Sequence, residues 1–138
     1  VNAILKLFKN LFYELGDAEA LEINFIGRVD VTPKEYLHMV RKKAGDVEAQ
    51  MRIGALLGSA SELEMEALAQ YGRSLGMMMI LRDDLADLLD EKELLHRVKM
   101  ESLPLPILYA LSDPKAKEEV ASIIRKKNMG RRDARKRI

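Results

Sequence analysis

Four aspartates lie close together in the segment Arg82-Asp83-Asp84-Leu85-Ala86-Asp87-Leu88-Leu89-Asp90. On a helix, Asp83 and Asp87 are four residues apart and Asp84 and Asp87 are three apart, so their carboxylates share a face. Like charges at these spacings repel one another, and the C-terminal end of a long helix disfavours anions further. Folding alone therefore gives no reason for the cluster.

A hard divalent cation supplies a reason, because Mg²⁺ prefers oxygen ligands and usually takes one or two carboxylates together with water and substrate phosphates. The cluster thus predicts a magnesium site that holds a diphosphate through the metal. Spacing alone leaves a second interpretation open, in which the aspartates form a solvated acidic face. The preceding run, residues 76–81, is strongly apolar, as expected where a hydrocarbon chain lies beside a charged head group. Its methionines are equally typical of a core.

Amphipathic helices must position these aspartates. Apolar residues recur at three- and four-residue spacings over residues 1–25, 33–57 and 61–90. Thr32 with Glu35 and Ser61 with Glu64 have the form of capping boxes. A charged, irregular segment is expected at 91–101, a short apolar helix at 107–111, and a further helix capped by Asp113. The pattern predicts an all-α antiparallel helical bundle.

The longest helical pattern contains two glycines, Gly72 and Gly76, four residues apart. Each glycine costs a helix about 1 kcal/mol relative to alanine, so a packing reason is expected. The spacing predicts a bare strip that another helix approaches closely.

Composition limits the chain to one ordinary domain. The chain has 138 residues, 48% of them hydrophobic, and a formal net charge of +1. Residues 125–138 form a basic tail without interleaved aromatics, which predicts a solvated end and no nucleic-acid partner. The domain is expected to span residues 1–124. Because there are no cysteines and no apolar run of spanning length, we expect a cytoplasmic protein without a membrane span.

Three blocks resemble motifs of the trans-isoprenyl diphosphate synthases, in that family's order and spacing. Residues 71–76, Tyr-Gly-Arg-Ser-Leu-Gly, followed by Asp83-Asp84-x-x-Asp87, look like the second aspartate-rich motif. Residues 36–45 are similar to the family's lysine-threonine helix, and residues 103–111 resemble the segment after its flexible loop. The resemblance covers most of residues 15–125. It implies the C-terminal part of the isoprenoid synthase fold.

The resemblance also implies a metal-dependent prenyl transfer, in which an allylic diphosphate ionises and the carbocation alkylates isopentenyl diphosphate. The implied metal ligands for Mg²⁺ are Asp83, Asp84 and Asp87. Lys43 would contact the same diphosphate and would act in catalysis with Asp83 and Asp84. Arg97 and Lys99 are the basic candidates for substrate binding in the loop after Asp90. The resemblance also implies a homodimer, the usual oligomeric state of the family.

Several positions depart from the family pattern. The loop after Asp90 is short, and unusual residues stand at five places: Glu19, Glu22, Ala44, Met79 and Ile80. The family's first aspartate-rich motif does not occur before Gly16. We therefore expect residues 1–138 alone to be inactive and to need an N-terminal half. The same departures motivate a second hypothesis, a non-catalytic helical subunit that modulates an active partner.

Overall fold

The computed structural model describes residues 2–119 and residue 122. The main helices of this part are α1 Asn2–Phe25, α2 Pro33–Lys43, α3 Gly45–Leu57, α4 Glu62–Leu89, α5 Glu91–Met100 and α6 Leu105–Ala110. Residues 114–119 are also helical, and the described residues contain no strand. The predicted all-α class is confirmed. The predicted basic tail, 125–138, lies outside the described residues, and its boundary stays a prediction.

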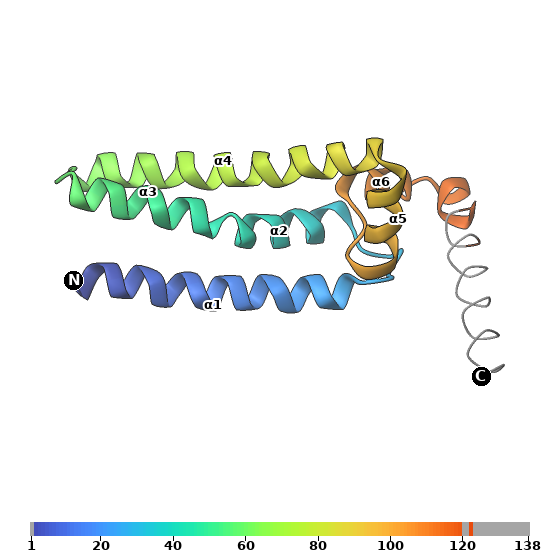
Figure 1. Ribbon diagram of the computed structural model, residues 1–138, viewed down its shortest axis with the longest axis horizontal. Coiled ribbons are helices and arrows are strands. Elements are labelled where there is room, and N and C mark those ends of the chain that lie inside the picture. Colours follow the sequence, from blue (N-terminus) through green and yellow to red (C-terminus); the bar gives the residue numbers. More distant parts are fainter. Residues whose placement is uncertain (1, 120–121, 123–138) are drawn as a thin grey trace.

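The long helices lie side by side in Figure 1, with α2 and α3 in one row between α1 and α4. The row runs antiparallel to both neighbours, as the bundle prediction requires. α4 packs mainly along α3, and α1 packs against both α2 and α3. α5 and α6 lie across the end of the bundle at which α4 ends. This end of the bundle carries the aspartate cluster.

Both predicted capping boxes are formed. The Thr32 amide donates to Glu35 Oε2 at 2.8 Å, and the Glu35 amide donates to Thr32 Oγ1 at 3.2 Å. Ser61 and Glu64 repeat the arrangement at the start of α4. Because each box satisfies two backbone donors that the first helical turn leaves free, the starts of α2 and α4 are fixed locally by sequence.

The predicted single helix over 33–57 is wrong, because the chain breaks at Ala44 between α2 and α3. The break leaves the Arg41 carbonyl free to accept a hydrogen bond from Arg73 Nη1 at 2.6 Å. A Cβ at Gly45 would lie 2.7 Å from Glu14 Oε2 and 3.2 Å from Arg73 Nη1. An arginine from α4 and a glutamate from α1 therefore occupy the break, and glycine makes room for them.

The prediction of irregular structure over 91–101 is also wrong, because residues 91–100 form α5. The Asp90 side chain caps this helix by accepting from the amides of Lys92, at 2.8 Å, and Glu93, at 3.3 Å. Glu91 and Glu93 stand in the first turn, where the helix dipole favours anions. The charges that suggested a loop therefore stabilise a helix N-terminus.

The glycine strip on α4 meets α3, as predicted. A Cβ at Gly72 would lie 2.7 Å from Met51 Cγ, 2.9 Å from the Val47 carbonyl oxygen and 3.1 Å from Glu48 Cα. A Cβ at Gly76 would lie 3.0 Å from that of Ala44. Since two of the atoms near Gly72 are backbone, the helices could accept a methyl group there only by moving apart.

We expect Gly72→Ala to lower the free energy of unfolding by about 1 to 3 kcal/mol, because overpacking outweighs the gain in helix propensity. Gly54→Ala on α3 is the matched control, since nothing among the described residues lies within 4 Å of its Cβ position. That change should stabilise by about 0.5 to 1 kcal/mol. Urea unfolding of both variants measures the difference, and equal effects would contradict the close approach.

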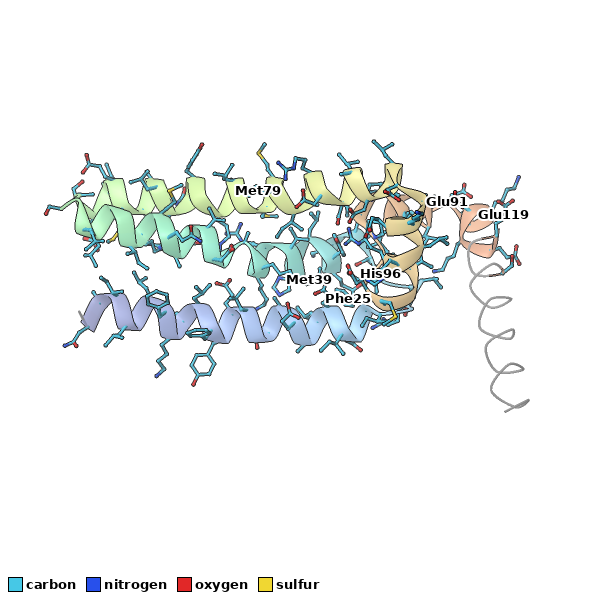
Figure 2. The ribbon with its side chains drawn as sticks, in the orientation of Figure 1. Phe25, Met39, Met79, Glu91, His96 and Glu119 are labelled. Atoms are coloured by element: carbon cyan, nitrogen blue, oxygen red, sulfur yellow. The ribbon has the colours of Figure 1, made fainter. Side chains whose placement is uncertain are left out.

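The main apolar core lies at the end of the bundle beside α5 and α6. Its buried residues come from α1, α2, α6 and the connecting segments: Phe25, Val31, Tyr36, Met39, Val40, Leu103, Leu108 and Leu111. Phe25 and Met39, labelled in Figure 2, mark this end. The core therefore adjoins the last turns of α4, where the aspartates lie.

Candidate functional site

A cavity of about 340 Å³ opens beside the aspartate cluster, between α1, the α2–α3 junction and α4. Its apolar lining is Leu15, Val47, Gly76, Met79 and Ile80. Met79, labelled on α4 in Figure 2, is 46% exposed. The charged lining is Glu19, Lys43, Asp46 and Asp83. The cavity thus combines an apolar wall with three carboxylates and one ammonium group.

Lys43, the predicted diphosphate contact, lines this cavity from the end of α2. Its Nζ donates to Glu22 Oε2 and lies 3.6 Å from Glu19 Oε1, so two carboxylates of α1 surround the ammonium group. The side chain is one-quarter exposed. Lys43 therefore lies at the same cavity as Asp83, and two carboxylates of α1 already pair with its ammonium group.

Asp83 faces the same cavity from α4. Its side chain is 62% exposed and pairs with the neighbouring Arg82, whose Nη2 lies 2.8 Å from Oδ1. A pair this exposed contributes little to stability, and the carboxylate stays accessible. Asp83 and Asp87 are one helical turn apart and share a face. The Asp87 side chain is about one-third exposed.

Asp84, in contrast, is buried, with 1% of its surface exposed. Tyr36 Oη lies 2.8 Å from Oδ2 and 2.9 Å from Oδ1, Arg97 Nη1 donates to Oδ1 at 2.6 Å, and the Leu105 amide donates to Oδ2 at 3.2 Å. The two oxygens therefore have donors from α2, α5 and α6. Asp84 therefore points into the core and, unlike Asp83, does not line the cavity.

Arg97, a predicted substrate-binding residue, lies inside this cluster with its side chain 9% exposed. Its Nη1 also donates to Asp87 Oδ2 at 2.9 Å, and its Nη2 donates to Tyr36 Oη at 3.3 Å. Burial opposes its charge, but the hydrogen bond and charge of Asp84 hold the pKa of Arg97 above its ordinary value. Burial and the charge of Asp84 raise the pKa of Tyr36, so its hydroxyl stays a donor. Lys99 lies on α5, and its side chain lies outside the described part.

Among the described residues, no group of three or more histidine, aspartate or glutamate side chains could hold a metal ion by itself. Mg²⁺ normally takes one or two carboxylates and completes its shell with water and substrate phosphates. Asp83, exposed at the cavity, fits that smaller requirement, and Asp87 offers the one oxygen that Arg97 does not hold. Asp84 does not fit it in this arrangement, because donors occupy its oxygens.

A second ionic cluster, centred on Arg73, was not predicted as functional from the sequence. Arg73 donates from Nη1 and Nη2 to the two carboxylate oxygens of Glu14, at 2.8 and 3.0 Å, and from Nε to Glu48 at 2.5 Å. It thereby joins α1, α3 and α4. An arginine inside the glycine strip, directly after Gly72, is its signal in the sequence, but its partners lie far away along the chain.

Comparisons with known proteins establish the family of the chain. Residues 2–138 match the family model described as Polyprenyl synthetase. A geranylgeranyl diphosphate synthase of Methanosarcina mazei is 40% identical over 91 residues, 65% of this chain and 28% of that protein. A heptaprenyl diphosphate synthase component 2 of Geobacillus stearothermophilus is 29% identical over 114 residues, 78% of this chain and 35% of that protein. The crystal structure of a polyprenyl synthase from Roseobacter denitrificans matches with a TM-score of 0.77 at 25% identity, over 87% of this chain and 40% of that one.

The fold is the all-α fold of prenyl synthases. The chain belongs to the polyprenyl synthetase family, which confirms the resemblance seen in its three sequence blocks. It spans between about a quarter and two fifths of the length of these relatives. Within the described residues, no helix is long and apolar enough to cross a membrane.

Proposed function

We propose that this chain is the part of a prenyl diphosphate synthase that holds the allylic diphosphate, in an enzyme that condenses it with isopentenyl diphosphate. The cavity beside Asp83 carries the proposal, since it sets an apolar wall against a cluster of charges. An allylic diphosphate has the same division into hydrocarbon and charged ends. Family membership supports the reaction class.

The charges of the cavity favour binding through metal. Glu19, Asp46 and Asp83 oppose the single ammonium group of Lys43 in the lining, so a bare diphosphate meets an excess of negative charge. Divalent cations that bind both the carboxylates and the diphosphate turn this repulsion into attraction. We propose that Asp83 and Asp87 hold Mg²⁺, which supplies electrostatic stabilisation of the leaving diphosphate when bound.

The chain's own residues bind and orient the substrate. Lys43 contributes a positive charge at the cavity, and its pairing with Glu22 fixes the ammonium group close to α1. Met79 and Ile80 offer apolar surface one turn before Asp83. These two side chains shield the hydrocarbon part of the substrate from water, and the diphosphate end of the substrate faces the aspartates.

We expect Asp83→Ala in a full-length protein containing this chain to lower kcat at least about a hundredfold. The change removes a proposed ligand of the Mg²⁺ that stabilises the leaving diphosphate. Glu62→Ala, at an exposed acid in the first turn of the same helix, is the control and should leave the rate unchanged. The assay follows transfer of labelled isopentenyl diphosphate to allylic diphosphates with Mg²⁺ and with EDTA. Residues 1–138 alone should show no turnover. Turnover that ignores Asp83→Ala would overturn the proposal.

A non-catalytic helical subunit is the second candidate. The pairing of Lys43 with two glutamates favours it, because those carboxylates compete with a diphosphate for the ammonium group. The name component 2, carried by a relative, denotes an enzyme made of more than one component. A stable heteromer that keeps full activity after Asp83→Ala would support this candidate over the first.

The predicted homodimer also remains a proposal. Leu5, Phe8 and Phe12 follow one stripe of α1 and are 60%, 43% and 70% exposed. An apolar stripe of this kind is typical of a surface that a partner covers. Sedimentation of the full-length protein would give the oligomeric state directly.

A further inference from the structure

The three aspartates of the motif have different surroundings, although their spacing places them together. Asp83 is exposed at the cavity, and Asp87 is partly exposed one turn later. Asp84, beside Asp87 on α4, is turned into the core and touches three further elements: α2 through Tyr36, α5 through Arg97 and the start of α6 through the Leu105 amide. One carboxylate thus connects α4 to α2, α5 and α6.

This connection conflicts with a role as a metal ligand. Both oxygens of Asp84 already accept hydrogen bonds, so a cation on Asp84 would have to displace Arg97 Nη1 from Oδ1 or the Tyr36 and Leu105 donors from Oδ2. Arg97 has little access to water and would lose its main partner. The Leu105 amide and the Tyr36 hydroxyl would lose their acceptor as well.

We infer that Asp84 is an anchoring residue, which holds α5 and α6 against the end of α4 and leaves the metal to Asp83 and Asp87. The inference rests on the proposed function for its metal. Arg97 completes the anchor, because its Nη1 bridges Asp84 and Asp87. It thereby fixes one oxygen of Asp87 and leaves the other for a cation.

Matched asparagine variants in the full chain separate the two roles. Asn keeps the size of Asp but removes the charge, and its NH2 group replaces one of the two acceptor oxygens, so it must meet either Arg97 or the Leu105 amide donor to donor. We expect Asp84→Asn to lower the midpoint of thermal unfolding without metal by about 10 °C. Asp83→Asn should leave that midpoint within about 2 °C of the unmodified chain, since its pair with Arg82 is exposed.

Titration with Mn²⁺ alone, read from the electron paramagnetic resonance signal of the free ion, measures metal binding below the unfolding temperature. Asp83→Asn should weaken Mn²⁺ binding at least about tenfold, while Asp84→Asn keeps it within about threefold. The inference is overturned if Asp84→Asn unfolds like the unmodified chain, or if it loses Mn²⁺ as Asp83→Asn does. An unmodified chain that binds no Mn²⁺ overturns the metal site of the proposed function, and the unfolding measurements then decide the anchoring role separately.

Discussion

Replacement of Arg97 by methionine is expected to lower the free energy of unfolding by about 3 to 5 kcal/mol, because it leaves the Asp84 carboxylate buried without a counter-charge. Asp84 is 1% exposed, so water cannot take the place of the guanidinium. Tyr36 and the Leu105 amide keep their hydrogen bonds to it but bring no positive charge. Chemical denaturation followed by circular dichroism measures the loss.

Arg82→Met is the matched control, since Arg82 also pairs with an aspartate of the cluster but is 74% exposed. Its effect should stay below about 1 kcal/mol. The double variant Asp84→Leu, Arg97→Met should regain most of the lost stability, because it removes both buried charges. If Arg82→Met and Arg97→Met cost the same, the buried pair does not stabilise the fold.

The helices of this chain could be predicted well where their signals are local. The capping boxes at Thr32 and Ser61 join residues three apart, and the Gly72–Gly76 strip lies within one turn. The break at Ala44 could not be predicted in this way. It depends on Arg73, which lies some thirty residues further along and donates to the carbonyl that the break exposes. A tertiary partner there outweighs an unbroken apolar periodicity.

The candidate site shows the same limit. Spacing predicts that Asp83, Asp84 and Asp87 share one face of α4. In the structure Asp83 lines the cavity, whereas Arg97 Nη1 donates to both Asp84 and Asp87. The surroundings of Asp84 are decided by Tyr36 and Arg97 on α2 and α5. The charge pattern of residues 91–101 predicts irregular structure in place of α5, so the sequence gives no signal for the burial of Arg97. Whether a charged residue binds substrate or holds the fold together depends on what packs around it.

Replacement of Arg73 by methionine is expected to destabilise the chain by about 2 to 3 kcal/mol at neutral pH, because Glu14 loses its charged donor and Glu48 keeps only Arg52. It should also make stability depend less on pH. Burial would raise the pKa of Glu48, but Arg52 and Arg73 outweigh it and hold that pKa below its ordinary value of 4.5. A carboxyl with a depressed folded pKa contributes stability above its unfolded pKa and loses it as the pH falls through the folded pKa.

The unmodified chain should therefore lose stability on acidification from pH 6 to below pH 4.5, and Arg73→Met should lose less over the same range. Asp30, Glu35 and Glu64 also have lowered pKa values, but their partners are the same in both proteins. Their contribution cancels when the two pH profiles are subtracted.

Glu48→Gln is the companion variant: it removes the titrating group and should give the same shallower profile. Urea unfolding at each pH supplies the curves. Parallel profiles for the unmodified chain and Arg73→Met would show that this arginine does not hold the Glu48 carboxylate in its charged form, and that another contact keeps α1, α3 and α4 together at the break.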